Sequence, residues 1–327
     1  MEKDNIDILE VKSTESKEKS LCFISPCLNE EENLEVLYNR LTSVRNDLHK
    51  EHNLESRIFF IDDGSTDQTW DIIQKLAKKD PTVQGLKLSR NFGKENALLA
   101  GYENAPESDF YLTLDADLQD DPSVVGKLVS KAFEGYQIVY AQRASRLDAA
   151  WYIFCTQIFY KIIQMGSKVK FPENVSDFYL ITEKVRKAFL QMQESVRYTR
   201  GLVFYTGFSR AGVQYNRPDR NAGTSKFNFV KLTIFMLDAV TSFTSLPVHL
   251  ISIAGLLLSI FSFILGVFYV LFSLFTKNAI PGWASMMSVS LFLGSVQILM
   301  VGVLAEYISR MSQELKSRPK YFVDEKL

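Results

Sequence analysis

Short apolar runs alternate with helical patterns through the first half of the chain. Runs with the length and composition of buried strands occupy residues 21–25, 57–61, 83–88, 110–114 and 138–141. Apolar side chains recur with helical spacing at residues 29–50, 66–79 and 91–104, and again from Pro122 onward. Strands that alternate with helices in this way predict an α/β fold, in which helices cover both faces of a mainly parallel sheet.

Two long stretches in the C-terminal part of the chain contain no Asp, Glu, Lys or Arg. They cover residues 250–275 and 278–305, and each is long enough to cross a hydrocarbon core of roughly 30 Å. The connection between them is short, so the pattern predicts a hairpin of two transmembrane helices at residues 250–275 and 281–305. Gly294 and Gly302 permit close helix approach, which is compatible with a homo-oligomer that associates through these spans.

The charges beside the hairpin predict its orientation in the membrane. Lys277 is the one cation between the two spans. The basic residues that flank the other ends are Lys226, Lys231, Arg310, Lys316, Arg318 and Lys320. The positive-inside rule therefore places both termini and the α/β domain in the cytoplasm, and it makes the chain a multi-pass protein of the cell membrane.

Composition along the chain assigns the remaining segments. Residues 1–20 are charged and lack an apolar run, so we expect a disordered polar tail rather than a signal peptide. The α/β domain then covers residues 21–225. Residues 226–249 are apolar and aromatic and predict an amphipathic juxtamembrane helix, and residues 306–327 are expected to form a basic cytoplasmic tail. Residues 151–169 are also amphipathic, and either an interfacial helix or a helix packed on the sheet explains them.

The overall composition excludes several classes of protein. The formal net charge is −1, so no global field attracts nucleic acid, and no nucleic-acid partner is expected. Hydrophobic residues make up 46% of the chain, which excludes a wholly disordered protein. The three cysteines, Cys22, Cys27 and Cys155, form no Cys-x-x-Cys pair, so neither a disulfide framework nor a zinc site is expected.

Polar side chains follow three of the predicted strands at the point where each strand ends. They are Asn29 and Glu30 after the first strand, Asp62 and Asp63 after the second, and Asp115 and Asp117 after the fourth. In open α/β sheets, ligands bind beyond the carboxyl ends of the strands. The sequence therefore predicts a binding site at this edge of the sheet.

The pair Asp115 and Asp117 is the strongest chemical signal at that edge. Two carboxylates at alternate positions can share a hard cation, and Mg²⁺ and Mn²⁺ prefer such oxygen ligands. Gln119 could supply a further oxygen. A metal held there would bind a diphosphate and offset charge on a leaving nucleotide. Taken alone, two aspartates at this spacing are weak evidence and more often form a solvated turn, so their sequence context decides the interpretation.

That context resembles the family-2 inverting glycosyltransferases. The greatest similarity is to the membrane-anchored polyprenyl-phosphate glycosyltransferases, which include dolichol-phosphate mannose synthases and bacterial undecaprenyl-phosphate (bactoprenol) glucosyltransferases. The matching stretches are ISPCLNEEENL at residues 24–34, IDDGSTD at 61–67, LSRNFGK at 88–94, LDADLQDDP at 114–122, SDF at 176–178, RG at 200–201, RNAGTSK at 220–226 and RPKYF at 318–322. The resemblance implies a Rossmann-like GT-A domain with a mainly parallel sheet, followed by the two-helix hairpin.

The resemblance also implies roles for individual residues. The positions that match nucleotide-sugar-binding residues are Pro26, Leu28, Glu30, Ile61, Asp63, Asp115, Ala116, Arg143, Arg220 and Lys226. Asp63 matches the aspartate that accepts a hydrogen bond from the uracil N3–H, and Ile61 would pack beside the base. A tyrosine is common where Leu28 stands, so stacking of a ring on the base is not expected. Arg143, Arg220 and Lys226 match basic residues that meet the phosphates.

Asp115, Asp117 and Gln119 match the metal and diphosphate site of the family. Asp117 and Asp177 match the residues closest to the chemistry, and Asp177 corresponds to an aspartate near the acceptor. A phosphate monoester acceptor has a second pKa near 6 and is already ionised at neutral pH. A strong general base is then unnecessary, so Asp177 could orient the acceptor or the sugar instead of removing a proton.

The resemblance implies inverting transfer of a sugar from a nucleotide-sugar, a UDP-linked hexose or N-acetylhexosamine, to undecaprenyl phosphate. The product would be a polyprenyl-phosphate sugar used in cell-envelope glycan modification, and Mg²⁺ or Mn²⁺ would be the cofactor. A processive polysaccharide synthase is one alternative, although residues 193–198 (QESVRY) lack the Gln-x-x-Arg-Trp stretch of those enzymes. A non-catalytic, membrane-anchored nucleotide-sugar-binding protein is the other.

Overall fold

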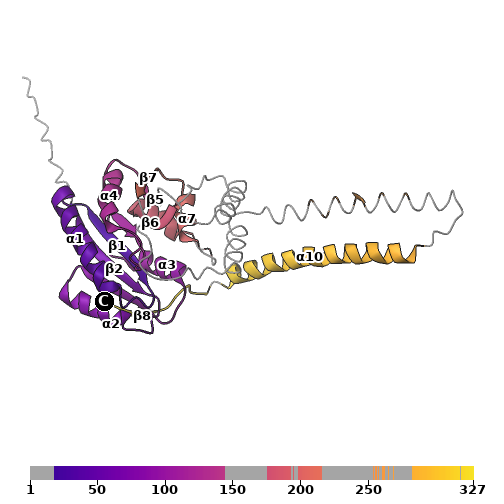
Figure 1. Cartoon of the computed structure of the whole chain (residues 1–327), viewed down its shortest axis with the longest axis horizontal. Coiled ribbons are helices and arrows are strands. Elements are labelled where there is room, and N and C mark those ends of the chain that lie inside the picture. The colour runs from indigo at the N-terminus through magenta and orange to yellow at the C-terminus, as the bar shows by residue number, and fades with distance from the viewer. Residues whose placement is uncertain are drawn as a thin grey trace, which may run out of the picture.

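An eight-stranded sheet with helices on both faces forms the main body of the protein, and one long helix projects away from it (Figure 1). The computed structural model describes residues 18–143, 175–192, 194, 198–215, 282–316 and 318–327, with isolated positions between 253 and 268. The predicted juxtamembrane helix at 226–249, the amphipathic segment at 151–169 and the residues Arg220 and Lys226 lie outside the described residues.

The elements follow one another in the order that the sequence pattern predicts for the first half of the chain. The strands are β1 (Ser20–Cys27), β2 (Glu55–Asp62), β3 (Val83–Leu88), β4 (Phe110–Thr113), β5 (Ile138–Arg143), β6 (Val175–Thr182), β7 (Arg210–Tyr215) and β8 (Val323–Lys326). The helices are α1 (Leu34–His52), α2 (Thr69–Lys79), α3 (Lys94–Asn104), η1 (Pro122–Val124), α4 (Val125–Phe133), α6 (Glu183–Leu190), α7 (Thr199–Tyr205) and α10 (Trp283–Leu315).

The sheet is mixed, with a parallel centre. Its strand order is β7-β5-β6-β4-β1-β2-β3-β8, and the four central strands β4, β1, β2 and β3 are parallel. β6 runs antiparallel to both β4 and β5, and β8 runs antiparallel to β3. The predicted α/β fold is therefore confirmed, with the parallel arrangement limited to the centre and to the β5–β7 pair. The carboxyl ends of β1, β2 and β4 meet at one edge.

Alternation along the strands produces two hydrophobic layers. On β1, Leu21 and Phe23 face the layer that α1, α2 and α4 cover, whereas Cys22 and Ile24 face the layer of α3, α6 and α7. All four side chains have no exposed surface. A strand buried on both faces has a continuous apolar sequence, which explains why residues 21–25 could be recognised as a strand. The sheet is thus a rigid platform for the loops at its edge.

The helices α1 and α3 begin later than the apolar spacing predicts. α1 begins at Leu34 instead of residue 29, because Asn29 adopts a left-handed backbone conformation with φ 56° and the following residues form a turn. α3 begins at Lys94 instead of residue 91, after Gly93 with φ 90°. In both cases the residues between the predicted and the observed start of the helix form a loop at the carboxyl edge of the sheet.

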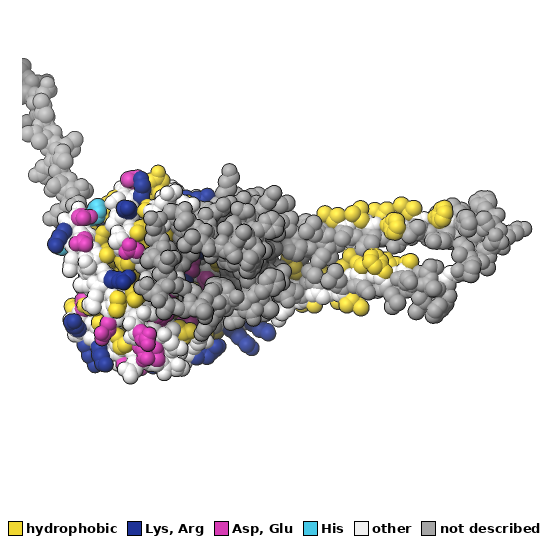
Figure 2. Space-filling model, in the orientation of Figure 1, with side chains coloured by type: hydrophobic (Ala, Val, Ile, Leu, Met, Phe, Trp, Pro, Cys, Tyr) yellow, Lys and Arg dark blue, Asp and Glu magenta, His cyan; other side chains and the backbone are white. Residues whose placement is uncertain are grey.

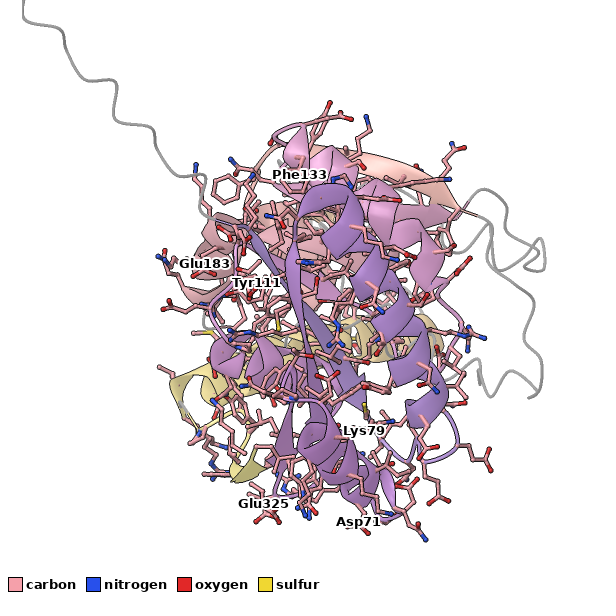
Figure 3. All side chains as sticks on the ribbon, turned by 90° about the vertical axis from the view of Figure 1, so that its left-hand side faces the viewer. Asp71, Lys79, Tyr111, Phe133, Glu183 and Glu325 are labelled. Carbon is pink, nitrogen blue, oxygen red and sulfur yellow. The ribbon has the colours of Figure 1, made fainter. Side chains whose placement is uncertain are left out.

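The C-terminal segment returns to the sheet, which differs from the basic tail expected at residues 306–327. α10 continues to Leu315, and β8 then pairs with β3. The Oε2 atom of Glu325, labelled at the lower end of the domain in Figure 3, accepts a hydrogen bond from Trp70 Nε1 at 3.0 Å. The N–H of Ser89 donates to the carbonyl of Phe322 at 2.9 Å. The end of the chain therefore stabilises the edge of the sheet and the loop after β3.

α10 has the length and composition of a membrane-spanning helix. Its segment Phe292–Ser309 has a mean hydropathy of 1.6, and none of this segment is buried. Hydrophobic side chains are exposed along the helix in Figure 2, including Ile298 at 75% exposure. The described positions between 253 and 268 are also helical, and a Cβ at Gly255 would lie 3.1 Å from Met300 of α10. The first predicted span therefore approaches α10 at this level.

Candidate active site

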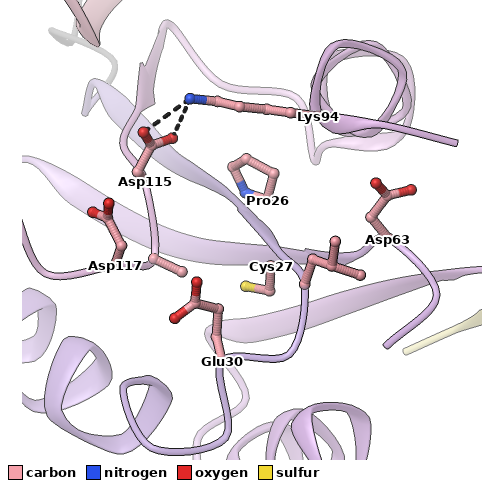
Figure 4. A pocket seen from close by; sticks show the side chains of 9 residues that line it. Pro26, Cys27, Glu30, Asp63, Lys94, Asp115 and Asp117 are labelled. Carbon is pink, nitrogen blue, oxygen red and sulfur yellow. Dashed lines mark hydrogen bonds and ion pairs between the residues drawn. The ribbon is translucent and has the colours of Figure 1, made fainter. Parts of the chain in front are cut away.

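A pocket of about 210 Å³ opens at the carboxyl edge of the parallel strands (Figure 4). The residues that line it are Pro26, Cys27, Leu28, Glu30, Asp63, Lys94, Asp115, Ala116 and Asp117. They come from the ends of β1, β2 and β4 and from the start of α3. The register of the sheet accounts for this convergence, because Cys27 pairs with Asp62 and Ile24 pairs with Thr113. The chain segments that follow these strands must leave the sheet side by side.

Hydrogen bonds join the loop after β1 to the segment that follows β2. The Asn29 side chain accepts a hydrogen bond from the N–H of Thr66 at 2.9 Å, and the N–H of Glu30 donates to Thr69 Oγ1 at 2.9 Å. Asn33 Nδ2 donates to Glu30 Oε2 at 2.6 Å. Burial raises the pKa of Glu30, and the hydrogen bond from Asn33 opposes this shift. The Glu30 carboxylate is therefore held in a fixed position on the pocket wall.

Asp63 is almost fully buried and is held by the loop that precedes α3. Its Oδ1 accepts a hydrogen bond from the N–H of Phe92 at 2.7 Å, and its Oδ2 accepts one from the N–H of Gly93 at 2.9 Å. Burial raises the pKa of Asp63, whereas these two backbone donors lower it. A carboxylate offers about four acceptor positions, so Asp63 retains capacity for a further donor from a bound ligand.

Gly64 allows the loop after β2 to approach the loop after β3 closely. Its φ is 71°, and a Cβ placed on it would lie 2.3 Å from the backbone carbon of Arg90. Only glycine occupies such a position without strain. The close approach places the N–H groups of Phe92 and Gly93 against the Asp63 carboxylate.

Lys94, the first residue of α3, joins two carboxylates of the site. Its Nζ lies 2.7 Å from Asp115 Oδ1 and 2.8 Å from Asp177 Oδ2. Burial lowers the pKa of Lys94, but Asp177 and Asp115 outweigh this and raise it above its ordinary value. Burial likewise raises the pKa of Asp115, and Lys94 opposes that shift. The sequence places Lys94 at the end of the matched stretch LSRNFGK, but no role for it was predicted.

Asp177 comes from β6, which lies next to β4 in the sheet. The sequence predicted a role for it near the acceptor, and the structure brings it to Asp115 through their shared contact with Lys94. Arg200 of α7 lies on its other side, with Nη1 3.6 Å from Asp177 Oδ1. Two cations therefore fix the Asp177 side chain from different directions.

The residues Asp115, Asp117 and Gln119 offer a set of oxygen donors that suits a hard divalent cation. The Oδ1 atom of Asp117 accepts a hydrogen bond from the N–H of Gln119 at 3.1 Å, so the loop that carries them turns tightly. Within the described residues, no group of three or more His, Cys, Asp or Glu side chains is arranged to hold a metal ion. A cation at Asp115 and Asp117 would therefore need further oxygen ligands, which a diphosphate or water can supply.

Three predicted site residues with described side chains do not line the pocket: Ile61, Gln119 and Asp177, which reaches the site through its contact with Lys94. Ile61 has no exposed surface and packs against Gly101 of α3, beneath the pocket. Gln119 lies just beyond Asp117, outside the lining set. Arg143 is the last residue of β5 and pairs with Tyr215, and its side chain is outside the described residues, as are Arg220 and Lys226.

Comparison with known proteins adds family information to this geometry. The family model described as glycosyl transferase family 2 matches residues 22–197, and the model described as the GtrB C-terminal hairpin matches residues 255–311. An uncharacterized glycosyltransferase of Synechocystis sp. is 38% identical over 306 residues, which cover 93% of this chain and 95% of that protein. A prophage-derived bactoprenol glucosyl transferase of Shigella flexneri is 37% identical over 304 residues, which cover 93% of this chain and 97% of that protein.

Among solved structures, a glucosyl-3-phosphoglycerate synthase from Mycobacterium tuberculosis, in complex with Mn²⁺, UDP and phosphoglyceric acid, is similar with a TM-score of 0.47. The sequence identity is 20%, and the match covers 68% of this chain and 78% of that chain.

Proposed function

The chain belongs to glycosyltransferase family 2, and from this membership we propose that it transfers a hexose from a UDP-linked donor to polyprenyl phosphate. Glucose is the first candidate for the sugar, because relatives at 36–37% identity are named bactoprenol glucosyl transferases. Undecaprenyl phosphate, the bactoprenol acceptor, is the candidate lipid. The product would serve as a sugar donor for modification of the cell envelope.

The observation that carries this proposal is the carboxylate pocket at the end of β1, β2 and β4 in a chain that matches the GtrB C-terminal hairpin. We propose that Asp63 accepts a hydrogen bond from the uracil N3–H of the donor, and that Asp115 and Asp117 hold a divalent cation, Mg²⁺ or Mn²⁺. Such a cation neutralises the diphosphate of the donor and favours its departure. A lipid acceptor cannot leave the bilayer, so a membrane anchor keeps the pocket close to it.

The reaction follows from the acceptor's chemistry. An oxygen of the polyprenyl phosphate attacks the anomeric carbon of the sugar from the face opposite the leaving group. The bond between that carbon and the β-phosphate oxygen of UDP breaks, UDP departs with the electron pair, and the configuration inverts. The acceptor needs no deprotonation, because it is already ionised. Asp177 lies between Lys94 and Arg200, which suits a role in orientation, so we assign it the positioning of acceptor or sugar.

The experiment that tests the proposal is a screen of nucleotide-sugars with the purified full chain, undecaprenyl phosphate and Mg²⁺ or Mn²⁺. Mass spectrometry of the lipid product identifies the sugar, and the configuration of the new bond can be assigned by NMR. We expect a lipid-phosphate hexose with UDP-glucose. If no UDP-sugar yields a lipid product while another nucleotide-sugar does, the donor assignment is wrong. A polymer without lipid phosphate would instead favour a processive synthase.

The stretch at residues 220–226 is expected to close over the phosphates and carry Arg220 and Lys226 to them. Loop closure of this kind excludes water, which would otherwise hydrolyse the donor. A charge-assisted contact contributes about 1.5–3 kcal/mol, so Lys226→Ala should lower the transfer rate by about 10- to 150-fold, with a smaller effect on UDP affinity. Arg220→Ala should act similarly and raise the ratio of hydrolysis to transfer. Initial rates at low substrate and release of free sugar are the measurements.

The matched control for this loop is Lys231→Ala, which removes the same charge a short distance along the chain but outside the motif. Its transfer rate should stay within about two-fold of the wild type. Wild-type rates for both Arg220→Ala and Lys226→Ala would show that the loop is only a linker. The basic residues that meet the phosphates would then have to be sought at Arg143 and Arg200.

The orientation of the hairpin can be tested separately from catalysis. We propose that both termini are cytoplasmic, because cations flank the outer ends of the two spans. A cytoplasm-dependent reporter fused after Leu327 should be active, and a cysteine introduced at Asn278 should react with a membrane-impermeant reagent added from outside. Activity of an export-dependent reporter at the same fusion point would contradict this topology.

A further inference from the structure

Lys94 connects the pocket to Asp177, which lies outside the set of residues that line it. Its ammonium contacts Asp115, which lies on the proposed metal and diphosphate side, and Asp177, which lies on the proposed acceptor side. Figure 4 shows Lys94 reaching across the pocket from α3 to both oxygens of Asp115. A lysine ammonium has three donors, and the hydrogen bonds to Asp115 Oδ2 and Asp177 Oδ2 use two of them.

The position of Lys94 in its helix is unfavourable without these partners. It is the first residue of α3, where the helix dipole presents its positive end and disfavours a cation. The N-cap residue, Gly93, has no side chain that could cap the helix, and its own N–H donates to Asp63 Oδ2. The two carboxylates therefore compensate for a charge that the helix itself repels, which favours a role for Lys94 in the site over a role in helix stability.

The charge pattern of the pocket indicates what that role is. Glu30, Asp63, Asp115 and Asp117 bring carboxylates to the pocket, and Lys94 brings the positive charge among the residues that line it. A divalent cation at Asp115 would meet the ammonium on the same carboxylate, and the two positive charges would repel each other. Lys94 and the cation therefore compete for Asp115, whereas the contact with Asp177 does not involve the metal ligands.

We propose that Lys94 is a positioning residue that couples the metal side of the site to the acceptor side. It competes with a divalent cation for Asp115 and, once displaced from Asp115, remains on Asp177 and orients that carboxylate for the acceptor phosphate. This inference rests on the proposed transfer reaction. Arg200 keeps the opposite side of Asp177 in place, so the Lys94 side chain can move without releasing Asp177.

The test compares Lys94→Met and Lys94→Arg in the full chain, with Lys131→Met as the matched control. Methionine keeps an unbranched side chain without charge, and arginine keeps the charge. Lys131 is an exposed lysine of α4 that pairs with Glu134, so it also loses an ion pair on substitution. Binding of Mn²⁺ is measured by calorimetry or by electron paramagnetic resonance, without donor sugar or acceptor lipid.

Lys94→Met should bind Mn²⁺ about 10-fold tighter than the wild type, because a competing cation has been removed. Its KM for undecaprenyl phosphate should rise by about 10-fold or more, because Asp177 has lost the nearer of the two cations that orient it and keeps only Arg200. Lys94→Arg should restore both quantities to near wild-type values, and Lys131→Met should change neither. If Lys94 served only the stability of the fold, the Lys94→Met variant would be less stable and would bind Mn²⁺ more weakly. That change is opposite to the tighter Mn²⁺ binding expected here.

Unchanged or weaker Mn²⁺ binding by a folded Lys94→Met variant would overturn the proposal. If the loss of Lys94 leaves Asp115 and Asp177 repelling each other and the variant unfolds, the double variant Lys94→Met/Asp177→Asn removes that repulsion, and the same tightening of Mn²⁺ binding is expected from it. Because the Mn²⁺ measurement needs neither sugar nor lipid, it can succeed even if the proposed donor or acceptor is wrong.

Discussion

Replacing Asp117 with alanine is expected to abolish sugar transfer while leaving the fold intact. Asp117 lies in the pocket and follows the buried strand β4, and the hydrogen bond described for its side chain joins it to the N–H of its neighbour Gln119. The proposed metal would lose one of its two carboxylates, and with it the stabilisation of the departing diphosphate. We expect the transfer rate to fall by at least about 1,000-fold and Mn²⁺-dependent UDP binding to be lost.

The matched control is Asp47→Ala, which removes an exposed carboxylate from α1, away from the pocket. It should retain wild-type transfer. Thermal unfolding of Asp117→Ala should differ little from that of the wild type, because the side chain is not part of the core. Substantial turnover by purified Asp117→Ala would show that the metal assignment is wrong, and the divalent cation would then have to be placed elsewhere.

Asp115→Ala should impair transfer nearly as strongly, but it tests a different contact. Asp115 is held by Lys94, whereas Asp117 is not described in contact with a cation. Loss of Asp115 therefore removes a proposed metal ligand and also frees Lys94 to pair with Asp177 alone. The two aspartates are two residues apart in the sequence, yet their surroundings differ, so the two variants test different contacts.

The fold of the first half of the chain could be predicted because its strands are short apolar runs buried on both faces. β3 has the same bounds as its predicted run. β1 and β2 are each a few residues longer than the runs predicted for them. Strand β6 was missed, because it lies antiparallel between β4 and β5 and follows a long segment that separates it from them in sequence. β8 was missed because it reaches β3 only after the chain has left the domain through the hairpin.

The site residues that follow the ends of strands could be predicted from the sequence. Glu30, Asp63, Asp115 and Asp117 follow strands, and the rule that ligands bind beyond the carboxyl ends of strands identifies them from the sequence. Lys94 could not be found in this way, because it begins a helix and contacts Asp115 and Asp177 across long sequence separations. The signal that could have identified it is a lysine at the first position of a helix, where its charge is unfavourable.

The contacts that hold Asp63 depend on the backbone geometry of neighbouring loops, which the sequence pattern does not reveal. Asp63 was predicted from its place after β2, but its two backbone donors belong to the loop before α3. Phe322, from the C-terminal segment, contacts that same loop through the N–H of Ser89, and its ring centroid lies 6.1 Å from that of Phe92. The chain end therefore supports the loop that holds Asp63, so residues that follow the C-terminal hairpin contribute to the predicted nucleotide site.

Gly64→Ala is expected to disrupt this loop arrangement and to impair both stability and donor binding. The left-handed conformation at Gly64 costs an alanine about 1–2 kcal/mol, and the contact of its Cβ with the Arg90 backbone adds about 1–3 kcal/mol of overpacking. A total loss of about 2–5 kcal/mol should lower the unfolding temperature by roughly 5–15 °C. Thermal unfolding in detergent, followed by tryptophan fluorescence, measures this change.

Donor binding should fall with stability, because relief of the contact at Gly64 moves Arg90 and the following N–H groups away from Asp63. UDP affinity, measured well below the unfolding temperature, should weaken by about 10-fold or more if one charge-assisted hydrogen bond is lost. The matched control is Gly126→Ala in α4, where a Cβ would meet nothing within 4 Å and the backbone is helical. That change should be neutral or stabilising by about 0.5–1 kcal/mol. Equal behaviour of the two alanine variants would mean that the loops after β2 and β3 are free to separate, and that the backbone contacts to Asp63 do not determine donor affinity.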